Sequence, residues 1–287
     1  MKNRTVARLL YAETVDMGGL PVRQPFPTKQ VGQIDPFLLL HHHLTTMPEH
    51  VVPHKTGVDP HPHRGFSPVT FVYRGGVHHR DSRGNNSVVY EGGTQWMNAG
   101  RGLVHSERPP QDILERGGVQ EIIQVWVNTP AANKMDQPEY TPLQAEATPT
   151  VTGEGVTVQV VAGEFGGVKG PVNTKSPVLA LRLELRAGAS YPLPLLAAYN
   201  AFLYLLDGLL HVEGYGLVEG LHQVVFNQDG EGITLTAKQD TRALLLAGKP
   251  LEEPVVANGP FVMNNETEIM QAMRDYQMGK LGILIEE

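Results

Sequence analysis

Glycine and proline interrupt this chain so often that long helices have little room to form. The 287 residues include 31 glycines and 22 prolines, spread along the whole sequence between short apolar stretches. Many short strands joined by tight turns produce this texture. We therefore expect an all-β protein with little helix.

Four segments have the composition of strands. Residues 178–186 alternate, with a leucine at every second position, which indicates a half-buried strand. Its apolar face comprises Leu179, Leu181, Leu183 and Leu185, and its polar face Arg182, Glu184 and Arg186. Residues 69–73, 122–127 and 243–247 are rich in β-branched, aromatic or leucine side chains and end at turn residues, so each is also expected to be a strand.

One short helix is expected near the C-terminus. Asn265 is a suitable N-cap, Glu268 completes a capping box, and Gly279 is a suitable stop. The apolar stripe that should pack on a sheet consists of Ile269, Met273 and Tyr276.

The two halves of the chain resemble each other. Residues 71–78 are similar to residues 202–211, and the sequence Val127-Asn-Thr-Pro130 is similar to Ala247-Gly-Lys-Pro250. We expect two similar barrels, an N-terminal one over residues 1–134 and a C-terminal one over residues 151–287 that also carries the helix. Residues 135–150, which contain three prolines, are expected to form the linker.

Two pairs of potential metal ligands lie in the N-terminal half, His61 with His63 and His105 with Glu107. Each pair is spaced i and i+2, which puts both side chains on one face of a strand. Two such strands side by side would bring three imidazoles and one carboxylate together, a set that suits Fe, Ni, Cu, Mn or Zn and leaves open positions on a six-coordinate ion. Alternatively, His61 and His63 belong to a solvated loop, and His105 is a core histidine partnered by Glu107. The chain has no cysteine, so N and O atoms must hold any metal.

The C-terminal half lacks an equivalent set of ligands. Its sequence Pro192-Leu-Pro-Leu195 aligns with Pro60-His-Pro-His63, so leucines replace the first two histidines. His211 and Glu213 repeat the spacing, but no second pair accompanies them. We expect this barrel to bind no metal. The run His41-His42-His43 is expected to be a strand with alternating faces, with His42 or the His41 and His43 pair near the barrel mouth.

Charge and hydropathy argue against two classes of partner. The net charge is -7 and no block of Lys or Arg stands out, so direct nucleic-acid binding is not expected. No run of eighteen apolar residues and no N-terminal signal segment is present, so membrane association is not expected either. A cytoplasmic location is the default, or a nuclear one if the source is eukaryotic.

Longer motifs around these ligands resemble those of the pirin family within the cupin superfamily. They are Asp59-Pro-His-Pro-His-Arg-Gly-Phe66, Gln95-Trp-Met-Asn-Ala-Gly-Arg-Gly-Leu-Val-His-Ser-Glu107, Gln124-Val-Trp-Val-Asn128, Ala162-Gly-Glu164 and Gly259-Pro-Phe-Val-Met-Asn264. The resemblance implies two tandem cupin barrels, of the double-stranded β-helix or jelly-roll type, with one metal held in the first by His61, His63, His105 and Glu107. The chain departs from the usual first cupin motif, since Ser67 or Pro68 stands where a glutamate is common.

The resemblance also implies a function. Members of the family are described as quercetin 2,3-dioxygenases, which open the central ring of a flavonol with dioxygen and release carbon monoxide. Fe(II) is then the expected ion, with Ni, Cu, Mn or Zn as alternatives, and Glu107 is expected to act as ligand and base. Phe66, Trp96 and Met97 are expected either to line the substrate pocket or to belong to the barrel core.

Two other functions are compatible with the same residues. Eukaryotic relatives are described as iron-binding redox sensors that act as transcriptional co-regulators, which for this chain would require a protein partner. In the third interpretation, the metal only stabilises a structural two-barrel module. We expect the dioxygenase.

Overall fold

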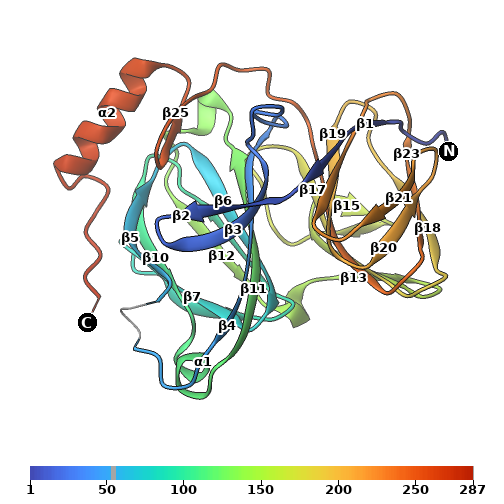
Figure 1. The fold of residues 1–287 in the computed structure, drawn as a ribbon. Coiled ribbons are helices and arrows are strands. Elements are labelled where there is room, and N and C mark those ends of the chain that lie inside the picture. The colour runs from blue at the N-terminus through green and yellow to red at the C-terminus, as the bar shows by residue number, and fades with distance from the viewer. Residues whose placement is uncertain (53–55, 287) are drawn as a thin grey trace. The chain divides into compact units, whose positions relative to one another are not determined.

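Strands make up most of the chain in the computed structural model, which describes residues 1–52 and 56–286 (Figure 1). Strands account for 55% and helices for 8%, and this confirms the all-β expectation. Neither helix in the described part of the chain is both long and apolar enough to cross a membrane. The chain divides into two compact units, Phe37–Glu146 with Glu252–Glu287 and Met1–Pro36 with Ala147–Leu251. They are named here the N-terminal barrel and the C-terminal barrel.

Two facing sets of antiparallel strands build the N-terminal barrel. One set has the order β12-β9-β6-β11-β4 and the other β5-β10-β7-β8. The strands are β4 (Phe37–Met47), β5 (Val58–His63), β6 (Phe66–Arg74), β7 (Gly76–Asp81), β8 (Asn86–Tyr90), β9 (Thr94–Asn98), β10 (Leu103–Arg108), β11 (Gly118–Asn128), β12 (Glu139–Leu143), β25 (Val256–Asn258) and β26 (Phe261–Met263). The helices are α1 (Gln111–Arg116) and α2 (Glu266–Gln277), with 3-10 turns η2 (Ala131–Asn133) and η3 (Ala145–Ala147) nearby in the chain.

The C-terminal barrel repeats this plan. Its sheets have the orders β1-β22-β19-β24-β17-β14-β13 and β18-β23-β20-β21, with one two-stranded sheet, β15–β16; β2 pairs with β3. The strands are β1 (Val6–Tyr11), β2 (Glu13–Met17), β3 (Leu20–Phe26), β13 (Thr150–Gly153), β14 (Val156–Ala162), β15 (Glu164–Phe165), β16 (Val168–Lys169), β17 (Val178–Leu185), β18 (Ser190–Pro194), β19 (Asn200–Asp207), β20 (Leu209–Val212), β21 (Gly216–Glu219), β22 (His222–Phe226), β23 (Gly232–Ala237) and β24 (Thr241–Gly248).

Each end of the chain belongs to the barrel farther from it in sequence. β1 pairs with β22, and the buried side chain of Arg4 donates to the carbonyl oxygens of Tyr199 and Leu196. The C-terminal residues 252–287 join the N-terminal barrel. These units differ from the expected boundaries at both ends, because backbone pairing and packing over long sequence separations leave no local signal. The expected linker contains β12, which pairs with β9.

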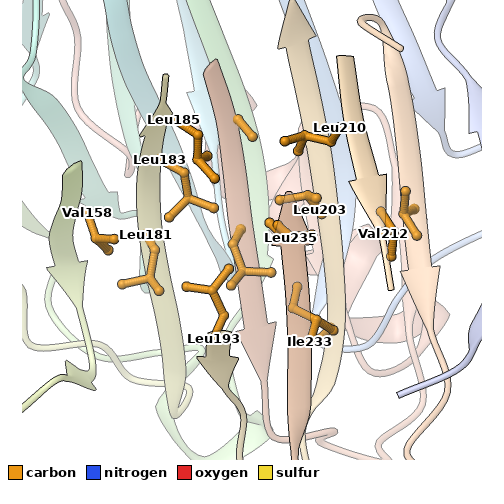
Figure 2. Close-up of a cluster of buried hydrophobic side chains, with 14 of the residues drawn as sticks. Val158, Leu181, Leu183, Leu185, Leu193, Leu203, Leu210, Val212, Ile233 and Leu235 are labelled. Atoms are coloured by element: carbon orange, nitrogen blue, oxygen red, sulfur yellow. The ribbon is translucent and has the colours of Figure 1, made fainter. Parts of the chain in front are cut away.

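Alternating apolar side chains fill the C-terminal barrel. Leu181, Leu183 and Leu185 of β17 all point into one buried cluster, as the alternation predicted (Figure 2). Leu193, Leu203 and other residues from neighbouring strands complete the cluster. The polar face differs in one respect from the expectation, because Arg182 is also buried.

The C-terminal helix α2 begins and ends where the sequence predicted. Asn265 caps it by accepting a hydrogen bond from the Glu268 backbone N–H at 3.0 Å, and Gly279 has a φ of 72°. The buried face is different, because Met273 and Tyr276 are 40% and 41% exposed. The side chains that turn inward are Ile269, Ala272 and Asp275. Asp275 does so because it pairs with a buried arginine, Arg64, at 3.0 Å.

The histidine run lies in β4 and alternates between the two faces of its sheet. β4 pairs with β11, so that His41 lies opposite Gln124 and His43 opposite Ile122. His42 points to the other face, where its Nε2 lies 3.3 Å from Glu121 Oε1. The expected strand with alternating faces is therefore present.

Burial of His41 should make the metal-free protein sensitive to acid. Desolvation lowers the pKa of His41 to about 4 from 6.5, because an imidazolium ion would lose its hydration. Between these pH values the unfolded chain binds more protons than the folded one, so the free energy of unfolding falls as pH falls. We expect His41 to account for a loss of about 2–3 kcal/mol between pH 7 and 4, at 1.36 kcal/mol for each pH unit.

Chemical denaturation of the metal-free protein at several pH values tests this. The His41→Gln variant should show a flatter profile than the wild type. His222→Gln is the control, because His222 lies in the C-terminal barrel and is partly exposed. Parallel profiles for the wild type and His41→Gln would contradict the prediction.

Candidate metal centre

Three histidines from two adjacent strands converge inside the N-terminal barrel. His61 and His63 lie on β5, and His105 of β10 lies directly opposite His61 in the antiparallel pairing. One ligand atom from each of the three lies within 4.8 Å of the others. The Nε2 atoms of His61 and His63 are 3.0 Å apart. Two nitrogen ligands at right angles on an ion, each at about 2.1 Å, would be separated by about 3 Å.

Backbone carbonyl groups fix the tautomers of the first two histidines. His61 Nδ1 lies 2.8 Å from the carbonyl oxygen of Asp59, and His63 Nδ1 lies 3.3 Å from that of Pro260. A carbonyl oxygen only accepts, so each Nδ1 must carry the proton. In a neutral imidazole the Nε2 atom then has a free lone pair, and it is the Nε2 atoms that face each other.

A second histidine and a carboxylate fix the tautomer of His105. His79 Nε2 donates to Asp81 Oδ2 at 3.1 Å, so the Nδ1 atom of a neutral His79 accepts from His105 Nδ1, 3.4 Å away. Burial disfavours the Asp81 carboxylate, but hydrogen bonds from His79 and Asn85 outweigh burial and lower the pKa of Asp81. The ionised Asp81 thus orients His79, and His79 orients His105.

The cluster has the properties of a site for a transition-metal cation. His105 Nε2 is buried and has no hydrogen-bond partner among the described residues. Burial, reinforced by the neighbouring histidines, lowers the pKa values of His63 and His105 well below 6.5 and favours their neutral, metal-binding form. Lone pairs that face one another in a buried space repel unless a cation lies between them. The donor set therefore fits a divalent transition metal.

Glu107 does not belong to this cluster of three. Its carboxylate accepts hydrogen bonds from Thr70 Oγ1 at 3.0 Å and from Gln124 Nε2 at 2.8 Å. The pairing of β10 with β5 shifts register between His105 and Glu107, which displaces Glu107 from the regular position beside the histidines. The structure brings together three of the four predicted ligands, and the role of Glu107 as the fourth remains a prediction.

Aromatic side chains adjoin His63 on the interior face of the barrel. The ring of Phe66 lies 5.0 Å from that of His63, and Trp126 lies 5.5 Å from His63 and 4.3 Å from Phe66. Trp126 Nε1 donates to Gln124 Oε1 at 3.1 Å, which connects this aromatic wall to the partner of Glu107.

Only two of the three predicted pocket residues share the interior face. In the pairing of β6 with β9, Thr70 lies opposite Gln95 and Val69 lies opposite Trp96. Thr70 contacts Glu107 and so marks the interior face, which Phe66 and Met97 share by alternation. Trp96 points to the opposite face and is buried there, so its expected place in the pocket is not supported by the register.

The sequence favours His78 and His79 for supporting or turn-stabilising roles and not as ligands, and His79 supports His105 in this way. Asp81, expected to pair with Arg80 on the surface, is buried and pairs with His79 instead. Gln124 and Trp126 were missed, although they form an i, i+2 pair on β11 as the ligands do. Their partners could not be named, because the registers β10–β7 and β11–β6 join residues far apart in the chain.

The partner of His105 should affect metal affinity without being a ligand. Replacing His79 with alanine leaves His105 Nδ1–H without its acceptor and frees the ring to rotate. We expect the Kd for Ni(II) to rise about 10- to 100-fold, measured by competition with a chelator. His78→Ala is the matched control, since His78 is the adjacent residue and its Nε2 lies 2.6 Å from Asn86 Oδ1 instead. Equal affinities of His79→Ala and His78→Ala would refute the orienting role.

Apolar residues occupy the corresponding positions of the C-terminal barrel. His61 lies opposite His105 in the pairing of β5 with β10, and Leu193 lies opposite Ile233 in the equivalent pairing of β18 with β23. Two residues further along the chain, Leu195 corresponds to His63 and Leu235 to Glu107. All four apolar residues belong to the buried cluster, and Figure 2 labels Leu193, Ile233 and Leu235. His211 lies on β20 instead, and the exposed Glu213, 3.9 Å from it, follows the end of that strand.

Comparisons with known proteins agree with this architecture. The family models "Pirin" and "Pirin C-terminal cupin domain" match residues 19–127 and 180–282. A pirin-like protein of Solanum lycopersicum is 36% identical over 97% of this chain and 93% of its own length, and Pirin of Homo sapiens is 34% identical over 92% and 89%. A crystal structure named as quercetin 2,3-dioxygenase from Acinetobacter baumannii has a TM-score of 0.93 and 33% identity, and covers 99% of this chain and 100% of that chain. The expected fold of two cupin barrels is confirmed.

Proposed function

Because the chain belongs to the pirin family, we propose that it is a metal-dependent dioxygenase that cleaves flavonols such as quercetin. The observation that carries the proposal is the convergence of the unprotonated Nε2 atoms of His61, His63 and His105 in a buried space next to an aromatic wall. The reaction would break the bonds from C3 of the flavonol to C2 and C4, place both atoms of dioxygen in the ring-opened product, and release C3 with its own oxygen as carbon monoxide.

The three histidines, with Glu107 as the predicted fourth ligand, would hold one divalent metal. When bound, Fe(II), or alternatively Ni, Cu, Mn or Zn, supplies Lewis acidity and the open positions that dioxygen chemistry requires. The donor atoms of this ligand set are imidazole nitrogens and carboxylate oxygens, with no thiolate.

Glu107 is the residue proposed to move a proton. Its carboxylate would accept the proton of the flavonol 3-hydroxyl group and leave a more electron-rich substrate anion. Thr70 and Gln124 each donate one hydrogen bond to Glu107 and so hold the carboxylate in a fixed orientation while leaving lone pairs for that proton. Phe66, Trp126 and Met97 would provide the apolar surface for a planar substrate and limit the access of water.

A second candidate function is favoured by the burial of the ligands. His63 and His105 are only 3% and 2% exposed, which leaves little open surface for a molecule of flavonol size. In this alternative the centre is an iron-binding redox sensor, and the chain acts as a transcriptional co-regulator through a protein partner. Oxidation state would then change binding to the partner, with no small-molecule turnover.

Oxygen consumption and carbon monoxide release on addition of quercetin test the proposal. Protein loaded to full occupancy with Fe(II) or Ni(II) should show both, in equal amounts. Glu107→Gln removes the base but keeps the shape of the side chain, so we expect turnover to fall by about 100-fold or more. His211→Ala, in the other barrel, should have no effect. If fully loaded protein turns over no flavonol, the enzyme proposal fails, and partner capture by reduced and oxidised protein tests the sensor.

A further inference from the structure

The last carboxylate of the described chain contacts the ligand strand β10 from outside the barrel. Glu286 Oε1 accepts from Ser106 Oγ at 2.5 Å, and Glu286 Oε2 accepts from Arg108 Nε at 2.9 Å. Ser106 stands between His105 and Glu107 in the sequence. Side chains alternate along a strand, so Ser106 and Arg108 point away from the metal centre while their neighbours point into it.

Arg108 carries this contact across to the other ligand strand. Its Nη1 donates to the carbonyl oxygen of Thr56, and its Nη2 donates to Asp59 Oδ1, both at 2.8 Å. The backbone carbonyl of Asp59 is the acceptor that fixes the tautomer of His61. A continuous path of hydrogen bonds therefore runs from Glu286 through Arg108 and Asp59 to a metal ligand.

This path crosses the place where the two ligand strands lose regular pairing. The register between β5 and β10 shifts after His105 and pairing resumes with Glu107 opposite Val58, so the backbone ladder is irregular between these two residues of β10. Arg108 connects the two strands next to this irregularity. Its side chain is 13% exposed and that of Glu286 is 14% exposed, so solvent screens this pair less than a surface ion pair.

Other parts of the same segment hold the tail in place. Ser82 Oγ donates to the carbonyl oxygen of Leu281 at 2.8 Å, and Leu281 is buried against Val104 and Phe261. Earlier in the segment, the Pro260 carbonyl fixes His63. The C-terminal segment thus supports both ligands of β5 and the strand that carries the third.

We propose that Glu286 is a positioning residue of the metal centre, which fixes the separation of the two ligand strands by accepting from Ser106 and by holding Arg108 against Asp59. The proposal rests on the proposed metal site, but not on the substrate or the reaction. It assigns to the C-terminal tail a role in metal affinity and in the geometry around the ion.

Co(II) is a suitable probe, because its visible absorption reports the number and arrangement of its ligands. We expect Glu286→Ala to raise the Kd for Co(II) about 10-fold and to change the visible spectrum of the bound ion. Glu286→Gln keeps an acceptor oxygen for Ser106 or Arg108 and should restore part of the affinity. Ile285→Ala is the matched control, because Ile285 is the adjacent residue and is 82% exposed.

The outcomes separate the two proposals. If the wild type binds no Co(II), the metal site itself fails, and this inference fails with it. If the wild type binds Co(II) but Glu286→Ala has the same Kd and spectrum, only the positioning role is overturned. An affinity loss that comes with an unchanged spectrum and a large drop in the melting temperature of the metal-free protein also overturns it, because general destabilisation explains that result.

Discussion

Replacement of His63 by alanine is expected to remove metal from the protein. Loss of a residue that hydrogen-bonds to a ligand, such as His79, should raise the Kd for the metal about 10- to 100-fold. Loss of a ligand itself should therefore raise the Kd more than about 100-fold. The two remaining histidines face each other across β5 and β10 and cannot replace the missing nitrogen, because no other imidazole of the described residues belongs to the cluster. Protein purified without chelator should contain about one transition-metal ion per chain in the wild type and almost none in His63→Ala, as measured by elemental analysis.

Two further variants sharpen this experiment. His211→Ala removes a histidine that has the same His-x-Glu spacing as His105 and Glu107 but lies in the C-terminal barrel, and its metal content should equal that of the wild type. Glu107→Ala tests the predicted fourth ligand separately. A metal content in His63→Ala equal to that of the wild type would show that the ion, if present, binds elsewhere.

Replacement of Leu193 by alanine should destabilise the C-terminal barrel by about 2–5 kcal/mol. Leu193 is 1% exposed and belongs to the cluster that fills the space where the N-terminal barrel has His61. The truncated side chain leaves a cavity that closely packed strands cannot close. Leu193→His should cost at least as much, because it also buries an imidazole without partners. The free energy of unfolding from chemical denaturation measures both changes.

Leu196→Ala is the matched control for this prediction. Leu196 is three residues further along the chain and 63% exposed, so its truncation should change the free energy of unfolding by less than about 0.5 kcal/mol. Metal content should be the same in Leu193→Ala as in the wild type, since the ligands lie in the other unit. Equal stability of Leu193→Ala and Leu196→Ala would contradict the assignment of Leu193 to the core.

Local patterns in the sequence predicted most of the fold and the centre of the site. The leucine at every second position in residues 178–186 was sufficient to place the leucines of β17, and the i, i+2 spacing selected His61, His63 and His105, because both patterns follow from the two-residue repeat of a strand. The N-cap Asn265 and the terminating Gly279 of α2 were also predicted from local sequence signals.

Contacts between distant residues could not be predicted in the same way. The inward turn of Asp275 depends on Arg64, and the tautomer of His63 depends on Pro260. The register shift after His105, which places Glu107 opposite Val58, depends on how β5 and β10 pair and not on the sequence of either strand. Nothing in a local pattern indicates which barrel the chain ends join.

The exchange of chain ends between the two units has a consequence for biosynthesis. A ribosome adds His61, His63 and His105 to the chain well before Pro260 and Glu286. Domains of most proteins fold as their residues emerge, but the N-terminal barrel lacks the acceptor for His63 and the Glu286 contacts until residues 260 and 286 have been made. The C-terminal barrel has all its strands earlier, when residue 251 emerges. The barrel that carries the three histidines is therefore the second of the two to have all its residues made.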